Sequence, residues 1–92
     1  MPFKAQFSKE FKSDLSKILK KDKARYEIII KKIEEITSRD INTIDFYKNL
    51  KHALKEYKRA HIDKSFVMLF KAYKNENTIL FEKIKHHDDV YK

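Results

Sequence analysis

The fold is decided by residues 55–84, Lys55-Glu-Tyr-Lys-Arg-Ala-His-Ile-Asp-Lys-Ser-Phe-Val-Met-Leu-Phe-Lys-Ala-Tyr-Lys-Asn-Glu-Asn-Thr-Ile-Leu-Phe-Glu-Lys-Ile84. Residues 55–62, 65–73 and 78–84 of this stretch have the composition and period of β-strands. The connections Asp63-Lys64 and Lys74-Asn-Glu-Asn77 both suit tight hairpins. Segment 65–73 is apolar on both faces, which is typical of a central strand. The stretch therefore predicts a three-stranded antiparallel unit.

The first half of the chain predicts one more strand and two helices. Phe3, Ala5 and Phe7 alternate with polar residues, as in a half-buried strand. Ser8 and Asp22 are suited to begin two successive helices, and apolar residues follow each of them at helical spacing. The turn at residues 20–23 is short, so the two helices should be antiparallel neighbours.

These elements predict an α+β fold with the order βααβββ and a possible final helical turn in residues 86–92. Two antiparallel helices should pack on one face of a small, mainly antiparallel sheet. The basic residues must then lie on the other face or at the rim. We expect residues 1–92 to form a single domain, because a chain of this length has one small core.

Composition excludes several classes of function. The chain has no glycine, which excludes a P-loop and a GxGxxG fingerprint, and it is too short to enclose a large cofactor. It has no cysteine, which excludes disulfides, iron–sulfur sites and a thiol nucleophile and fits a cytoplasmic location. No apolar run approaches the roughly 18 residues of a membrane span, and residues 1–7 do not resemble a signal peptide. The formal net charge of +8 indicates a polyanionic partner, such as nucleic acid, a membrane surface or an acidic protein.

Residues 47–64 form the densest basic stretch. Its cations are Lys48, Lys51, Lys55, Lys58, Arg59 and Lys64, and the rings between them are Tyr47, Tyr57 and His61. Cations interleaved with aromatic rings suit a single-stranded RNA backbone with unstacked bases. The alternative is an ordinary solvated face rich in lysine.

The tail, His86-His-Asp-Asp-Val-Tyr-Lys92, is a second cluster. If it is helical, His87 and Tyr91 are four residues apart and share a face, where an imidazole and a phenol suit proton transfer. The alternatives are a frayed polar terminus and a metal site, but the tail lacks the spacing of a metal-binding motif, and we predict no metal and no cofactor. Taken alone, His61 is more typical of a turn or hydrogen-bonding residue than of a catalyst, and His52 has a weaker claim.

The element order, the basic stretch and the tail together resemble the RelE/ParE superfamily of toxins from type II toxin–antitoxin systems. The resemblance rests on Tyr47-Lys-Asn-Leu-Lys-His-Ala-Leu-Lys-Glu-Tyr-Lys-Arg-Ala-His-Ile62, then on Phe66-Val-Met-Leu-Phe-Lys71 and on the segment from Phe81 to Tyr91. The chain is similar to archaeal RelE proteins and to the YafQ-like branch. The chain departs from these patterns at Glu56, Ser65 and Val67, where the family has Gly, Asp and Arg.

The resemblance implies an mRNA interferase, an endoribonuclease that cuts messenger RNA in the ribosomal A site. The 2′-OH would attack the adjacent phosphate, giving a 2′,3′-cyclic phosphate and a free 5′-OH without a metal. The implied partners are mRNA, the ribosome and an acidic antitoxin, which could form a heterotetramer with the toxin. The alternatives are a toxin directed at gyrase and a degenerate domain that binds only RNA or the antitoxin.

The resemblance also implies roles for single residues. His61 and His87 would share the acid and base work, Lys58 and Lys85 would hold the phosphate, and Tyr91 would stack on a base or assist proton transfer. Lys48 falls where the YafQ-like branch has another histidine. Lys51, Lys55 and Arg59 are further RNA-binding candidates, with Arg59 the weaker choice because its neighbour Lys58 points to the other face of the strand.

Overall fold

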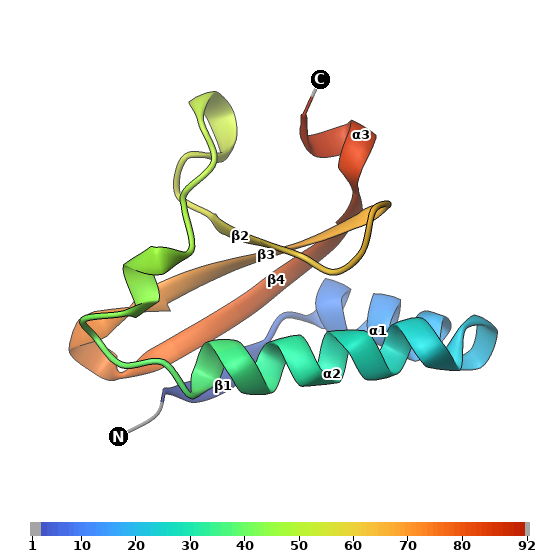
Figure 1. Cartoon of the computed structure of the whole chain (residues 1–92), viewed down its shortest axis with the longest axis horizontal. Coiled ribbons are helices and arrows are strands. Elements are labelled where there is room, and N and C mark those ends of the chain that lie inside the picture. Colours follow the sequence, from blue (N-terminus) through green and yellow to red (C-terminus); the bar gives the residue numbers. More distant parts are fainter. Residues whose placement is uncertain (1–2, 92) are drawn as a thin grey trace.

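The computed structural model describes residues 3–91 and has the predicted α+β architecture (Figure 1). The two long helices lie on one side of the sheet, and the segment before β2 and the last helix lie on the other. The strands are β1 (Lys4–Phe7), β2 (Lys58–His61), β3 (Phe66–Tyr73) and β4 (Thr78–His86), and the helices are α1 (Lys9–Lys21), α2 (Lys23–Thr37) and α3 (His87–Val90).

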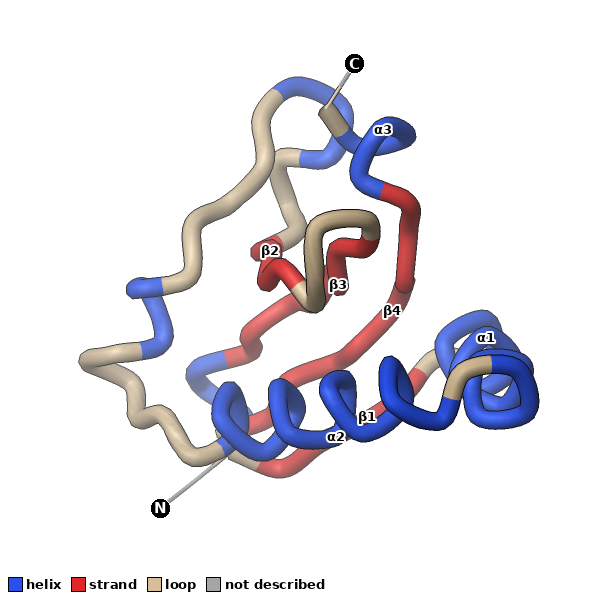
Figure 2. Tube along the Cα trace, turned by 45° about the vertical axis from the view of Figure 1, so that its right-hand side comes forward, coloured by secondary structure: helices blue, strands red, loops and turns tan. Residues whose placement is uncertain are grey.

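Side-chain caps set the starts of α1 and α2. Ser8 accepts a hydrogen bond from the backbone N–H of Phe11 at 3.0 Å, and Asp22 accepts one from the N–H of Arg25 at 3.0 Å. Each cap satisfies an N–H that has no partner inside the helix. Because Asp22 both ends α1 and begins α2, the helices form a tight hairpin, and Figure 2 shows α1 nearly end-on beside the start of α2.

The sheet has the strand order β1-β4-β3-β2. β1 pairs with β4 in parallel, and β3 pairs antiparallel with both β4 and β2. The predicted central position of β3 is confirmed, because β3 has a strand on either side.

Two apolar clusters hold the layers together. The larger one lies between the helices and the sheet and includes Phe11, Ile29, Phe70 and Phe81, all fully buried. The smaller one lies on the opposite face and consists of Leu50, Val67 and Leu69, with Leu54, Tyr57 and Val90 packed against it. The second face of the sheet is therefore partly covered by residues 50–57 and by α3.

The first strand of the predicted three-stranded unit is shorter than expected. We predicted residues 55–62, but β2 begins only at Lys58. The preceding residues turn back on themselves, since Leu50 donates to the carbonyl of Tyr57 at 2.9 Å and Arg59 donates to that of Lys48 at 3.1 Å. Residues 48–50 thus run beside β2 and cover its outer edge.

Among the helices of residues 3–91, none has both the length and the apolar character that a membrane span requires.

Candidate active site

Strand alternation in β2 decides which side chains reach the second face of the sheet. Ala60 is buried in the cluster beneath the helices, so Arg59 and His61 point to the opposite face. The register pairs Arg59 with Leu69 and His61 with Val67, and both partners belong to the smaller apolar cluster. Arg59 and His61 therefore lie together at the edge of that cluster.

Helix α3 brings the tail to the same place. It is tied down where the backbone N–H of His87 donates to the carbonyl of Ser65 at 2.6 Å, and Val90 packs on the smaller cluster. The ring centroids of His61 and His87 are 5.8 Å apart. Tyr91 lies 4.5 Å from His87 and stacks nearly parallel to His61 at 5.9 Å. The predicted residues His61, His87 and Tyr91 thus form one three-ring cluster, although His61 lies on β2 and the other two lie in the C-terminal tail.

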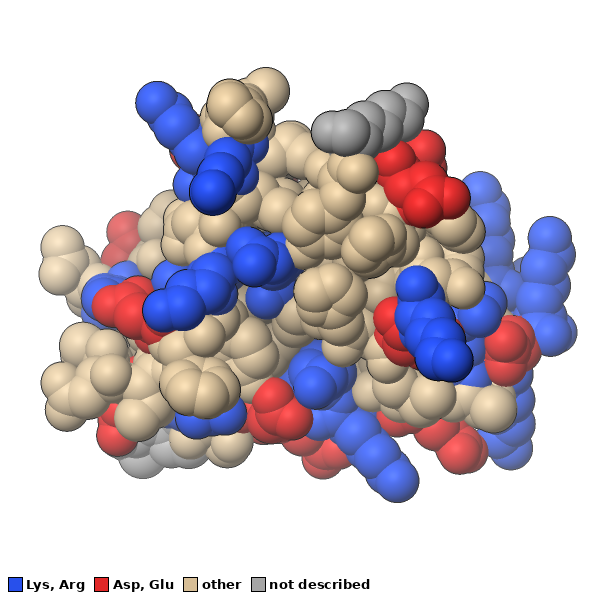
Figure 3. Space-filling model, turned by 45° about the horizontal axis from the view of Figure 1, so that its top comes forward, with Lys and Arg blue, Asp and Glu red and all other residues tan. Residues whose placement is uncertain are grey.

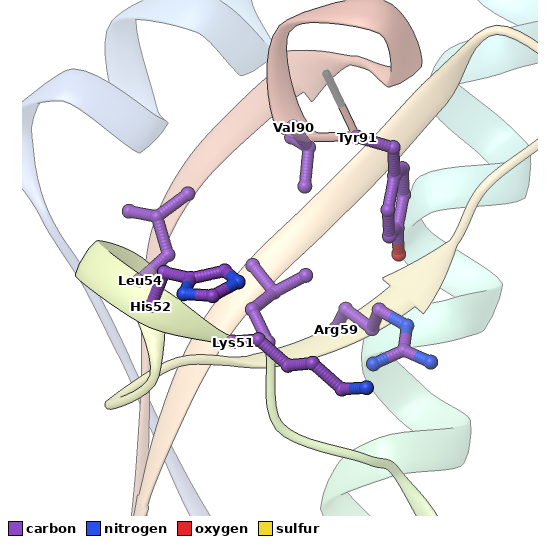
Figure 4. Close-up of a pocket in the computed structure, with 7 residues that line it drawn as sticks. Lys51, His52, Leu54, Arg59, Val90 and Tyr91 are labelled. Atoms are coloured by element: carbon purple, nitrogen blue, oxygen red, sulfur yellow. The ribbon is translucent and has the colours of Figure 1, made fainter.

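Arg59 supplies a positive charge beside these rings. Its guanidinium carbon lies 5.8 Å from the centre of the Tyr91 ring, and one of its nitrogens donates to the carbonyl of Asn49 at 3.0 Å. Arg59, Tyr91 and Lys51 line a pocket of about 320 Å³ between residues 50–54 and α3 (Figure 4). In this view the Tyr91 side chain extends from the end of α3, and its hydroxyl points toward Arg59. An anion in the pocket would meet a guanidinium and a phenol together.

Lys58 lies outside this arrangement. Its ammonium donates to the carbonyl of Tyr47 at 3.0 Å and to Oδ1 of Asn49 at 3.1 Å, and it pairs with Asp45 at 3.1 Å. Only 12% of its side chain is exposed. The structure therefore brings Arg59 to the histidines and uses Lys58 to hold residues 45–49 against the sheet.

The other predicted cations surround the site at different distances. Lys48 is exposed at the edge of β2, Lys51 lines the pocket, and Lys55 is exposed at the turn before β2. Lys85 is two strands away from His61 and on the same face, because Val67 pairs with both residues. Figure 3 shows Lys and Arg side chains running across one side of the molecule toward its centre.

Two further residues lie near the site: His52, a weaker candidate in the sequence, and Lys32, which was not a candidate. His52 lines the pocket and has a positive φ of 61°, a conformation that costs a non-glycine residue about 1 kcal/mol or more. Lys32, on α2, lies near His61 and disfavours its protonated form. No motif marks Lys32, and only the folded chain brings it near β2. Within residues 3–91, no group of three or more His, Asp or Glu side chains is placed to hold a metal ion.

The surroundings of His61 lower its pKa below the ordinary value of 6.5. Partial burial is the main cause, and repulsion from His87, Arg59 and Lys32 adds to it. The His61 ring is therefore neutral near pH 7 and free to accept a proton.

Replacing Lys32 by Gln is expected to raise the pKa of His61 toward its ordinary value. The substitution removes a positive charge that disfavours the protonated ring. It also frees the carboxylate of Glu35, which Lys32 contacts at 3.3 Å, and this change acts in the same direction. NMR titration of the His61 ring measures the shift. Lys31→Gln is the control, since it removes the same charge from an exposed position of α2, and an unchanged or lower pKa in Lys32→Gln would contradict the assignment.

Comparison with known proteins identifies the family. No family model matches the chain. The chain is 46% identical over 78 residues to "Putative toxin RelE4" of Methanocaldococcus jannaschii, and the match covers 85% of this chain and 79% of that protein. It is also 38% identical over 82 residues to an uncharacterized protein of Methanosarcina mazei, covering 89% of this chain and 91% of that protein.

Solved structures share the fold at lower identity. The YoeB dimer of Staphylococcus aureus superposes with a TM-score of 0.74 at 17% identity, over 95% of this chain and 99% of that one. YafQ in the DinJ–YafQ complex of Escherichia coli superposes with a TM-score of 0.62 at 17% identity, over 98% and 99% of the two chains. The extent and identity of the match to the Methanocaldococcus protein show the family: the chain belongs to the RelE superfamily of toxins.

Proposed function

We propose that this chain is the toxin of a toxin–antitoxin system and acts as an endoribonuclease on mRNA, without a metal ion. The observation that carries the proposal is the convergence of two imidazoles, one phenol and one guanidinium within about one side chain's reach. Cleavage of RNA by its own 2′-OH needs a base, an acid and a cation on the phosphate. The cluster supplies all three types of group.

In the proposed reaction His61 takes the proton from the 2′-OH. The 2′ oxygen forms a bond to phosphorus, the bond from phosphorus to the 5′ oxygen breaks, and His87 gives a proton to that leaving oxygen. The products are a 2′,3′-cyclic phosphate and a 5′-OH. His61 suits the role of base because its lowered pKa keeps the ring unprotonated near pH 7, so that it can accept a proton. Arg59 would balance the charge that develops on the phosphate, and Tyr91 would stack on a base or pass a proton.

The cations around the cluster support a nucleic-acid substrate. Lys48 and Lys51 flank Arg59 on the segment that borders β2, and Lys85 lies on the same face of the sheet. Such cations bind the phosphate backbone without reading its sequence. We place the substrate in the ribosomal A site, where the mRNA is single-stranded and its bases are accessible.

The same basic surface supports an antitoxin partner. YoeB and YafQ have been solved in complexes with YefM and DinJ, and a chain with a net charge of +8 suits an acidic partner. An acidic antitoxin would cover the three-ring cluster and exclude RNA. Harmless overexpression of the chain without a partner would count against this role.

The experiment that tests the activity is cleavage of mRNA by the purified protein, with and without translating ribosomes, with ends mapped by primer extension. We expect cuts inside codons only when ribosomes are present, and cyclic phosphate at the upstream ends. Cuts in free RNA would support the proposed nuclease activity and contradict the proposed requirement for the ribosome. No cuts under either condition, with the protein folded, would favour a non-nuclease toxin or a binding domain.

A further inference from the structure

A second groove borders β2 and is separate from the pocket that Lys51, Arg59 and Tyr91 line. It has a volume of about 350 Å³ and runs between α2 and the segment before β2. The residues that give it its character are Lys32, Arg39, Phe46, Lys48, Arg59 and His61. Because Arg59 also lines the first pocket, the two hollows meet at Arg59, next to the three-ring cluster. We call this second hollow the α2–β2 groove.

The α2–β2 groove has a strong excess of positive charge. Four cations line it, one on α2, one in the loop after α2, one in the segment before β2 and one on β2, and Glu35 is the only acid among its lining residues. The Glu35 carboxylate is already occupied, since it accepts a hydrogen bond from the hydroxyl of Tyr47 and contacts Lys32 at 3.3 Å. An anion entering the groove would therefore meet cations whose charge is only partly balanced.

Phe46 gives the groove an aromatic surface that faces water. It is 72% exposed, more than any other large apolar side chain of residues 3–91. Its backbone is held in place, because Ile44, two residues earlier, is fully buried in the main core and the N–H of Phe46 donates to the carbonyl of Thr43 at 3.0 Å. An exposed ring that lies among cations offers a surface on which a nucleic-acid base can stack.

The guanidinium of Arg39 is placed to act with this ring. Its central carbon lies 5.1 Å from the centre of Phe46 and 5.3 Å from the centre of Tyr47. A planar cation among aromatic rings beside Lys48 matches the groups of one nucleotide, with a base that stacks on the ring and a phosphate that pairs with the cations.

We infer that the α2–β2 groove is a nucleotide subsite, which holds the nucleotide next to the scissile phosphate with its base on Phe46 and its phosphate on Arg39 and Lys48. The inference rests on the proposed function, because Arg59 and His61 join this groove to the cluster that cuts. A strand of RNA crossing β2 would place one base in the groove while the scissile bond lies over His61. The subsite therefore helps to fix the register of the RNA.

The test measures binding of a short single-stranded RNA that carries 2′-O-methyl groups and so cannot be cut. Fluorescence anisotropy compares the wild type with Phe46→Leu, Phe46→Trp and the matched control Tyr73→Leu, which removes another exposed aromatic ring outside the groove. We expect Phe46→Leu to weaken binding at least about fivefold, which corresponds to the loss of one base–ring stack. We expect Phe46→Trp to restore binding and Tyr73→Leu to leave it unchanged. Thermal unfolding confirms that each variant is folded.

A series of RNAs with one abasic position each locates the stacked base. One abasic position should weaken binding by the wild type and leave binding by Phe46→Leu unaffected, because the stack is already absent there. Equal affinity of the wild type and Phe46→Leu for every RNA would overturn the proposed subsite. If the wild type still cleaves mRNA, the proposed nuclease activity would stand. Loss of ribosome binding alone in Phe46→Leu would overturn the subsite too, and would assign Phe46 to ribosomal RNA. A wild type that neither binds nor cuts RNA would overturn both proposals.

Discussion

Substitution of His61 or His87 by alanine is expected to lower the rate of mRNA cleavage at least about 10²-fold, the usual contribution of a general acid or base. Each imidazole is within ring contact of the other and of Tyr91, so either loss removes one proton-transfer partner from the reaction. The measurement is single-turnover cleavage of ribosome-bound mRNA. The double variant should be little worse than the single ones, because groups that act on one transition state are not additive.

His86→Asn is the control for the two histidine variants. His86 is adjacent to His87, but its ring packs on Phe66 at 5.5 Å, and its Nδ1 accepts a hydrogen bond from the N–H of Asp88. Asparagine keeps an acceptor at this helix start, so the rate should stay within about threefold of the wild type, well below the loss expected for a proton-transfer group. Near-normal cleavage by His87→Ala would remove it from the reaction.

Arg59→Gln is expected to reduce kcat about 10²- to 10³-fold, as for loss of one group that stabilises a developing negative charge. Lys58→Met, one position earlier, should change kcat less than about tenfold. The two side chains point in opposite directions from β2. Arg59 lies at the Tyr91 ring. Lys58 is held by Asp45, Asn49 and the carbonyl of Tyr47. The rates are compared at saturating substrate.

Lys58→Met should instead loosen residues 45–49. This segment carries Phe46 and Lys48, which line the α2–β2 groove, so the variant is expected to raise KM more than it lowers kcat. Lys58→Arg should restore KM in part, because a guanidinium can reach the same acceptors. If Lys58→Met, still folded, lost as much kcat as Arg59→Gln, then Lys58 would act on the phosphate directly.

Local signals in the sequence were sufficient for most of the fold. The caps at Ser8 and Asp22 and the apolar run of β3 depend on neighbours within a few residues, and these predictions agree with the structure. β1 forms as predicted, but Ala5 is exposed like Lys4 and Gln6, so its burial does not alternate as expected. The start of β2 was wrong because the turn of residues 51–57 depends on hydrogen bonds with residues 48–50. Such pairing leaves no period in the sequence.

The sequence indicated which residues are candidates for the site, but it did not indicate how they are arranged. Strand alternation shows that Lys58 and Arg59 point in opposite directions, but which of them faces His87 depends on where α3 packs. That position is set by Val90 on the smaller apolar cluster. The resemblance drew attention to Lys58, whereas the fold places Arg59 at the rings. The proximity of Lys32 to His61 is likewise a product of long-range packing.

The parallel pairing of β1 with β4 has a consequence for how the chain folds. Ser8, at the end of β1, donates its hydroxyl proton to the carbonyl of Glu82, 74 positions later. The α1–α2 hairpin and the β2–β3–β4 meander involve neighbours along the chain, but the pairing of β1 must close nearly the whole chain into a loop. Loop closure over such a separation costs entropy before any contact compensates for it. Folding is therefore expected to be limited by this closure, so that the two halves of the molecule become one cooperative unit only when the first strand docks.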